Sequence, residues 1–182
     1  MSKTKKNATI ADVIKARRMA LNTREGYASL FLRIIVLTLA AYVIFTKVFL
    51  ITQNNGLGMF PAMKDGDLVI AFRLQEEYAK NDVVVYTMDG KQRVGRIIAR
   101  ETDVIAMDGS GTLRVNGTVQ SGEILYPTYA KEKLEYPYSV PEGHMFIMGD
   151  YRTNAEDSRD HGPVPMENLD AKVITILRRR GL

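Results

Sequence analysis

Residues 56–67 read GLGMFPAMKDGD, and the rest of the chain is arranged on either side of this stretch. A long apolar segment precedes it, and short segments rich in Val, Ile, Tyr and Phe follow it. The stretch therefore marks a change from an apolar helix to a β domain, and it contains no Ser, Thr or Cys.

The apolar segment covers residues 30–51, LFLRIIVLTLAAYVIFTKVFLI. Arg33 and Lys47 interrupt it near its ends, where long side chains can reach lipid headgroups. At 1.5 Å per residue a helix of this length covers about 33 Å, which is enough to cross a bilayer. We therefore predict a transmembrane helix at residues 30–51. A buried core helix and a cleaved signal peptide are the alternatives.

Positive charge is concentrated before this segment. Residues 1–33 carry eight Lys or Arg and two acidic residues, whereas the remainder carries 17 Lys or Arg against 19 Asp or Glu. This asymmetry predicts a cytoplasmic segment at residues 1–29 and an extracellular domain at residues 52–182. The basic part adjoins an apolar segment and has no interleaved aromatic residues, so we expect membrane lipid and not nucleic acid as its partner. Residues 9–21 have the apolar spacing of an amphipathic helix, with a basic leader without regular structure as the alternative, and residues 22–26 are expected to break the pattern.

Segments typical of β-strands occupy most of the chain after the apolar helix. A hydrophobic content of 46% is sufficient for a buried core in a single domain of this size. Asp89-Gly90 and Asn116-Gly117 are typical of tight type I′ hairpin turns. The sequence therefore predicts a mainly β fold, with an antiparallel β domain after the transmembrane helix. The expected strands are residues 68–72, 82–87, 93–100, 104–107, 113–115, 143–148 and 172–177.

The sequence contains no cysteine. This absence excludes thiol catalysis, cysteine-based zinc sites and disulfides. His144 and His161 lack the spacing of metal ligands and lie in loop-like contexts. We therefore expect no metal site and no cofactor.

Three boxes resemble those of the type I signal peptidases. Residues 56–61, followed by Gly66-Asp67, resemble the Gly-x-Ser-Met-x-Pro box, and residues 94–98, VGRII, resemble the Val-Lys-Arg-Ile-Ile box. Residues 148–164 contain GDYR, DSR and GPV, which are similar to the family's Gly-Asp-Asn-Arg, Asp-Ser-Arg and Gly-x-Val. Three boxes in this order behind one apolar span are more specific than any one of them. The resemblance covers residues 30–182 and implies a signal-peptidase-like β domain.

The resemblance also implies a catalytic arrangement that this chain lacks. In the family a Ser hydroxyl attacks the peptide bond, a desolvated neutral Lys accepts its proton, and a second hydroxyl orients the Lys. The matching positions here are Gly58, Gly95 and Ala155. On a strand, Lys91 and Arg93 would share a face with Gly95, but Lys91 is four residues away, about 13 Å along the strand. We therefore predict no catalytic residue at these positions.

We still expect a cleft that binds an extended polypeptide. The charged residues that surround the site in the family are present in this sequence. The charged framework residues can pair and fix the loop around the site. The candidate peptide-binding residues are Gly56, Leu57, Gly58, Met59, Pro61, Val94, Gly95 and Arg96, and the framework residues are Asp150, Arg152, Asp157, Ser158 and Arg159.

The first functional hypothesis is a non-catalytic signal-peptidase-like membrane protein that is not an enzyme. Degenerate members of the family in Gram-positive bacteria act in pilus assembly, so the resemblance implies a pilin subunit or another exported protein as partner, together with a sortase. The alternative is an active type I signal peptidase that removes signal peptides with other groups. A membrane-anchored β domain whose boxes serve only folding is the third hypothesis.

Overall fold

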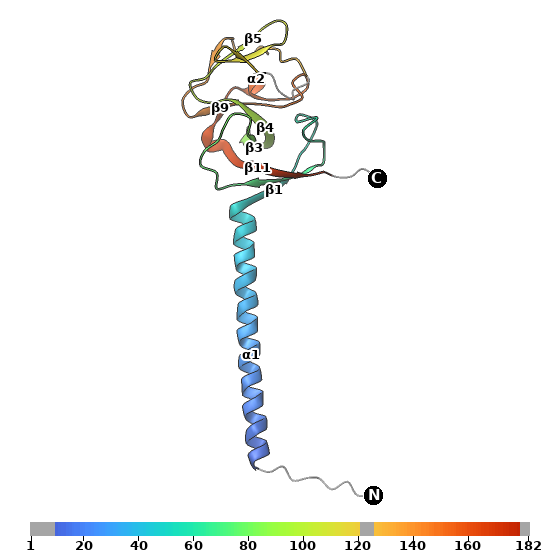
Figure 1. The fold of residues 1–182 in the computed structure, drawn as a ribbon, viewed down its shortest axis with the longest axis vertical. Coiled ribbons are helices and arrows are strands. Elements are labelled where there is room, and N and C mark those ends of the chain that lie inside the picture. The colour runs from blue at the N-terminus through green and yellow to red at the C-terminus, as the bar shows by residue number, and fades with distance from the viewer. Residues whose placement is uncertain (1–9, 121–125, 179–182) are drawn as a thin grey trace. The chain divides into compact units, whose positions relative to one another are not determined.

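The computed structural model describes residues 10–120 and 126–178. The chain divides into an N-terminal unit that ends at Ile44 and a β domain that begins at Phe45 (Figure 1). The functional boxes all lie in the β domain.

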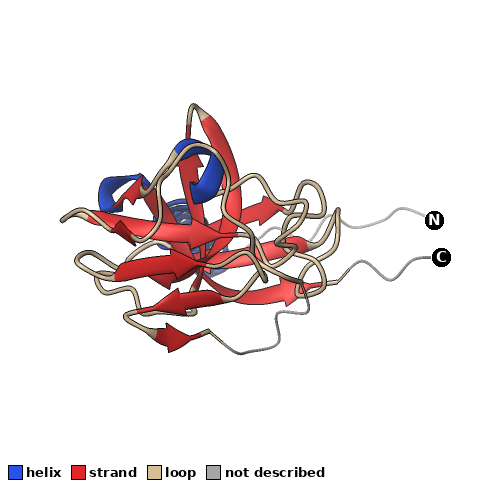
Figure 2. Cartoon of the chain, turned by 90° about the horizontal axis from the view of Figure 1, so that it is seen from above, coloured by secondary structure: helices blue, strands red, loops and turns tan. Residues whose placement is uncertain are grey.

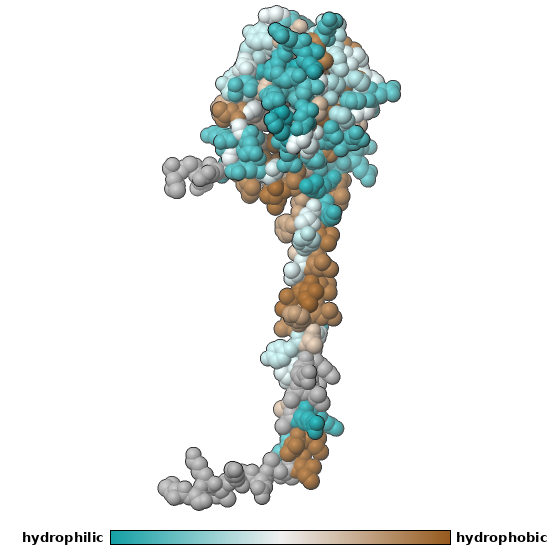
Figure 3. Space-filling model, turned by 180° about the vertical axis from the view of Figure 1, so that it is seen from behind, coloured by the Kyte–Doolittle hydropathy of each residue, from teal (hydrophilic) through white to brown (hydrophobic). Residues whose placement is uncertain are grey.

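The N-terminal unit is built around a single long helix. α1 (Ile10–Val43) is followed by the short π-helix η1 (Ile44–Val48). Within the described residues, one helical segment is long and apolar enough to cross a membrane, Gly26–Val48, with a mean hydropathy of 2.3. Its hydrophobic side chains are exposed and appear brown in Figure 3. An N-terminal apolar helix of this kind is consistent with a membrane anchor.

Two boundaries of this segment differ from the sequence-based expectation. The helix runs without interruption through residues 22–26, because a glycine in a helix costs only about 1 kcal/mol and a long helix tolerates it. The helix was also expected to reach Ile51, but Phe49–Gln53 forms strand β1. Its residues pair with β2, Phe49 opposite Phe72 and Ile51 opposite Ile70. The apolar run therefore supplies the end of a helix and the edge of a sheet.

The β domain contains one large and one small antiparallel sheet. The large sheet has seven strands in the order β1-β2-β11-β3-β4-β9-β10, and the small one has the order β7-β6-β5-β8. Figure 1 shows β5 of the small sheet at one end of the β domain and β1 and β11 at the other. The remaining strands of the large sheet are β2 (Leu68–Phe72), β3 (Val83–Met88), β4 (Lys91–Ala99), β9 (His144–Met148), β10 (Val164–Pro165) and β11 (Leu169–Leu177), and those of the small sheet are β5 (Val104–Met107), β6 (Leu113–Val115), β7 (Thr118–Val119) and β8 (Tyr138–Ser139).

The predicted mainly β fold is confirmed. Each segment that the sequence marked as a strand is a strand in the structure, with its ends shifted by no more than a few residues. Figure 2 shows the β domain as strands joined by loops, and its helical elements within the described residues are the end of η1, α2 (Ser158–His161) and the 3-10 helix η2 (Met166–Asn168). The two predicted hairpin turns have the positive φ values that type I′ turns require, 52° and 72° at Asp89 and Gly90 and 51° and 76° at Asn116 and Gly117.

The hydrophobic core holds the two sheets together. Phe146 and Met148 of β9 pack with Ile98 of β4 and with Ile105 and Val115 of the small sheet. Phe146 is fully buried, so it connects the box-bearing strands of the large sheet to the small sheet.

Truncation of this connecting side chain tests the core. We expect Phe146→Ala to lower the free energy of unfolding by about 3–5 kcal/mol, because it removes apolar contacts and leaves a cavity. Leu74→Ala is the control, since Leu74 is 60% exposed and its loss should change stability by less than about 0.5 kcal/mol. Urea unfolding of the detergent-solubilised chain measures both, and equal effects would contradict this description of the core.

Candidate functional site

The first box is held in a tight turn between β1 and β2. Asn54 anchors this turn, because its backbone N–H donates to Asp67 O at 2.8 Å and its side-chain Nδ2 donates to Lys64 O at 2.9 Å. Gly56 N donates to Asp65 Oδ1 at 2.6 Å, and Gly56 has a φ of 89°, a conformation that favours glycine. These bonds fix the backbone that leads into Gly58.

The third box lies directly against the first. Tyr151 N donates to Gly58 O at 3.0 Å. A Cβ added at Gly149 would lie 2.5 Å from Gly58 O and would also overlap Ala155 Cβ, so the close approach requires glycine at 149. A Cβ added at Gly58 would lie 3.8 Å from Ala155 Cβ, which is ordinary van der Waals contact. Gly58, where the resemblance implies a nucleophile, therefore has room for a side chain.

The second box differs in this respect. Gly95 lies on β4 opposite Val84, and a Cβ added to it would lie 2.5 Å from Ile147 Cγ2 and 3.2 Å from Tyr86 Cε1. Tyr86 and Ile147 belong to one buried hydrophobic cluster, and burial raises the pKa of the Tyr86 phenol. Neighbouring side chains therefore occupy the space beside Gly95.

This difference can be tested by adding a methyl group at each glycine. We expect Gly58→Ala to change the free energy of unfolding by less than about 0.5 kcal/mol. Gly95→Ala should lower it by about 1–3 kcal/mol through overpacking. If Ile147 is the obstacle, the cost of Gly95→Ala should fall in an Ile147→Ala background, which a double-mutant cycle in urea measures. Equal costs at both glycines would contradict the geometry.

The framework of the third box is a set of buried charges. Asp157 and Arg159 form an ion pair at 2.8 Å, and their side chains are 1% and 2% exposed. Asp157 also accepts a bond from Arg159 N and so caps α2. Arg96 of the second box donates two hydrogen bonds to Asp150, at 2.6 and 2.8 Å. The charges thus join the second and third boxes.

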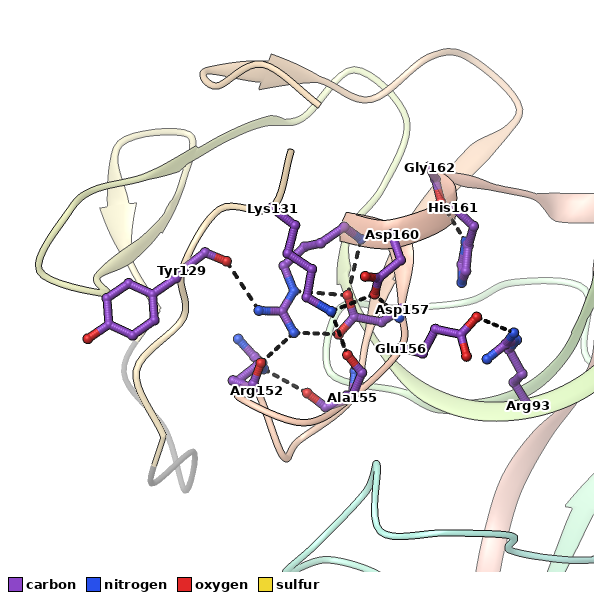
Figure 4. Close-up of polar contacts among 12 residues, drawn as sticks. Arg93, Tyr129, Lys131, Arg152, Ala155, Glu156, Asp157, Asp160, His161 and Gly162 are labelled. Carbon is purple, nitrogen blue, oxygen red and sulfur yellow. Dashed lines mark hydrogen bonds and ion pairs between the residues drawn. The ribbon is translucent and has the colours of Figure 1, made fainter. Parts of the chain in front are cut away.

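The charged framework residues were expected to pair with one another, but the hydrogen bonds of the Arg152 side chain go to neutral groups. Its guanidinium donates to Gly149 O at 2.9 Å and to Thr128 Oγ1 at 3.0 Å. Burial lowers the pKa of Arg152 to about 10. Arg159 donates to Arg152 O at 2.6 Å and to Tyr129 O at 3.2 Å, and Figure 4 labels the two acceptor residues. The arginines therefore attach the loop of the third box to residues 128–129.

Loss of the buried carboxylate tests this framework. We expect Asp157→Ala to lower the free energy of unfolding by about 3–5 kcal/mol, because the Arg159 guanidinium would stay buried without its partner. Glu135→Ala removes an exposed carboxylate and should have an effect below about 0.5 kcal/mol. Thermal and urea unfolding of both variants provide the measurement, and a loss below about 1 kcal/mol for Asp157→Ala would contradict the proposed role.

A cleft of about 330 Å³ lies next to the contact between the first and third boxes. Residues 52–58, 91–94 and 154–156 line it. Of the candidate peptide-binding residues, Gly56, Leu57, Gly58 and Val94 line this cleft.

The other candidate residues lie elsewhere. Met59 is 1% exposed and belongs to the core, and Gly95 is buried beside Ile147. Arg96 is bonded to Asp150, and Pro61 is outside the cleft lining. Tyr151 packs against other aromatic rings, with Phe60 at a centroid distance of 6.1 Å and Tyr126 at 4.5 Å.

Several cleft residues were not selected from the sequence. Arg93 and Glu156 line the cleft and form an ion pair at 2.8 Å. The hydrogen bond from Arg93 lowers the pKa of Glu156. Thr52 and Lys91 also line the cleft, and Thr52 Oγ1 lies 2.8 Å from Gln92 Oε1. Strand alternation had already placed Lys91 and Arg93 on one face, but no local signal identifies Glu156 or Thr52.

The fold and the three assembled boxes define a signal-peptidase-like β domain. A family described as signal peptidase, peptidase S26 matches residues 27–177, and the chain belongs to this family.

The similar proteins are peptidases and proteases. Mitochondrial inner membrane protease subunit 1 of Schizosaccharomyces pombe is 32% identical over 78% of this chain and 82% of its own length. Signal peptidase I of Aquifex aeolicus is 51% identical over 68% of this chain and 48% of its own length. A crystal structure of a signal peptidase I from Enterococcus faecalis is 24% identical, covers 55% of this chain and 98% of that one, and has a TM-score of 0.47. The chain spans between about one third and four fifths of the length of these and other curated relatives.

These comparisons correct the prediction that the chain is not an enzyme. The family and the relatives named above are signal peptidases or proteases, so the prediction is wrong. The absence of side-chain groups at Gly58 and Gly95 excludes those two positions as nucleophile and base, but it does not establish an inactive protein.

Proposed function

We propose that this chain is a membrane-anchored endopeptidase of the signal peptidase type that acts on exported polypeptides. The observation that carries the proposal is the cleft formed where the first and third boxes meet. Membership of the signal peptidase family supports this function. We further propose that the N-terminus is cytoplasmic and the β domain extracellular, on the basis of the basic residues before the apolar helix.

The cleft offers an open strand edge for a polypeptide. β4 pairs with β3 along residues 91–96, but its pairing with β9 begins at Arg96. Among the described strands, residues 91–95 therefore have a neighbour on one side only. An extended polypeptide can add as a strand at such an edge through main-chain hydrogen bonds.

Cleavage in this cleft needs a hydroxyl that Gly58 does not supply. Among the described residues that line the cleft, Thr52 alone carries a hydroxyl side chain. We therefore assign the nucleophile of the proposed reaction to Thr52: its Oγ1 adds to the scissile carbonyl carbon, the peptide C–N bond breaks, and the hydroxyl proton passes by way of the Glu156 carboxylate of the cleft lining to the leaving amine. Thr52 Oγ1 donates to Gln92 Oε1 at 2.8 Å, and Gln92 Nε2 donates to Asp170 Oδ2 at 3.4 Å, so these bonds orient the Thr52 side chain.

A cleavage assay tests this assignment. The chain in liposomes should release the mature product from a preprotein with a cleavable signal peptide. Thr52→Val should lower the rate by about 1,000-fold or more, since loss of a nucleophile removes most of the rate enhancement. Thr52→Ser, which keeps a hydroxyl, should retain measurable activity, and Thr112→Val in the small-sheet region is the control.

The outcomes separate the parts of the proposal. Absence of product from the native chain would overturn the proposed peptidase activity, and unchanged product from Thr52→Val would overturn the assignment of Thr52. A Gly58→Ser variant adds a hydroxyl at a position that has room for it, and its rate is compared with that of the native chain in the same assay.

The identity of the polypeptide stays a prediction. A pilin subunit or another exported protein, acting with a sortase, is the expected partner. A photo-crosslinking residue at Leu57, which lines the cleft and is 48% exposed, would capture it in the native membrane. Mass spectrometry of the crosslinked product would identify the protein, and a product without an exported polypeptide would contradict the prediction.

A further inference from the structure

The cleft carries more positive than negative charge. Lys91 and Arg93 line it, and Glu156 is the acidic residue of its lining. Lys91 is exposed and forms no ion pair with any residue that the structure describes. Arg93 is bonded to Glu156 through Nη2, whereas its Nε is buried and has no hydrogen-bond partner in the described part of the chain. The charge of Asp89 acts on Arg93, but Asp89 lies in the β3–β4 turn, outside the cleft lining.

The two cations have the spacing of a β-strand. Lys91 and Arg93 are alternate residues of β4, so their side chains leave the same face about 7 Å apart. They lie on the part of β4 that has an open edge. An extended polypeptide added there would present alternate side chains at the same spacing.

We propose that the cleft selects extended polypeptide segments with acidic side chains at alternate positions, and that Lys91 and Arg93 determine this specificity. The inference rests on the proposed function, in which a polypeptide occupies the cleft. Carboxylates form short, charge-assisted hydrogen bonds with guanidinium and ammonium groups. A bound carboxylate can take the place of Glu156 at Arg93 Nη2 and can pair with the ammonium of Lys91.

Glu156 competes with the bound polypeptide in this arrangement. Its side chain is 64% exposed, whereas that of Arg93 is 16% exposed. An ion pair with one exposed partner contributes little stability, so Glu156 can turn towards solvent at small cost. Glu156 therefore pairs with Arg93 in the free protein, and a carboxylate of the polypeptide replaces it.

Peptide binding tests the proposal independently of cleavage. The full chain in nanodiscs is titrated against fluorescent nonapeptides that carry Glu, Gln or Lys at two alternate positions, and anisotropy reports binding. We expect the Glu peptide to bind about tenfold more tightly than the Gln peptide and the Lys peptide to bind most weakly. The advantage of the Glu peptide should decrease as the salt concentration rises.

Two variants should move the specificity in opposite directions. Lys91→Glu should favour the Lys peptide over the Glu peptide, because it reverses one charge of the cleft. Glu156→Gln should strengthen binding of the Glu peptide by about three- to tenfold, because it removes the competing carboxylate. Lys133→Glu makes the same charge change at an exposed position outside the cleft lining, and it should leave the order of the peptides unchanged.

The possible results distinguish failure of the acidic specificity from failure of the proposed function. Equal binding of the Glu and Gln peptides would overturn the acidic specificity and leave polypeptide binding intact. Failure of every peptide to bind a correctly folded chain would overturn both. An equal response to Lys91→Glu and Lys133→Glu would show that net charge governs binding, which would overturn the roles of Lys91 and Arg93.

Discussion

The geometry of the site depends on the buried carboxylate of Asp157. Its Oδ2 accepts hydrogen bonds from Gly149 N at 3.2 Å and from Arg159 Nη2 at 2.8 Å. Gly149 is the residue whose close approach brings the third box against Gly58. Arg159 in turn bonds to Arg152 O. A buried ion pair adds little net stability compared with apolar residues of the same volume, so we attribute its role here to fixing the position of the loop.

Much of the fold follows from local sequence patterns. The strands of the β domain are rich in Val, Ile and other apolar residues, and the Asp89-Gly90 and Asn116-Gly117 turns join neighbouring strands. The end of the helix was not predictable in the same way, because a run such as Phe49–Gln53 suits a helix or a strand equally well. Its pairing with β2 decides the question, and that pairing depends on residues further along the chain.

Site residues that are neighbours in the sequence could be predicted, whereas residues brought together from distant parts of the chain could not. Gly56, Leu57 and Gly58 line the cleft because they lie in one turn. Met59 follows them directly but turns into the core. The pair of Arg93 and Glu156 joins residues 63 positions apart, so neither residue signals the other.

Gly58 and Gly95 both lack a side chain, but their surroundings in the structure differ. In the sequence, Gly58 and Gly95 are equivalent losses of a polar group. In the structure, Gly58 has room for a side chain, whereas Ile147 and Tyr86 close the space at Gly95. Core side chains therefore fill the space beside Gly95, where the resemblance implies a base, and the charged groups in this cleft are Lys91, Arg93 and Glu156.

The charge of the cleft is local and does not follow from the charge of the domain. The sequence after residue 33 has a net charge of −2, so long-range attraction would not bring an acidic polypeptide to it. Salt limits the reach of each charge to about 8 Å at physiological ionic strength. Recognition of acidic side chains by Lys91 and Arg93 must therefore act through direct contact, after the polypeptide has entered the cleft. This contact affects the lifetime of the complex more than its rate of formation, because short-range contacts act mainly on dissociation.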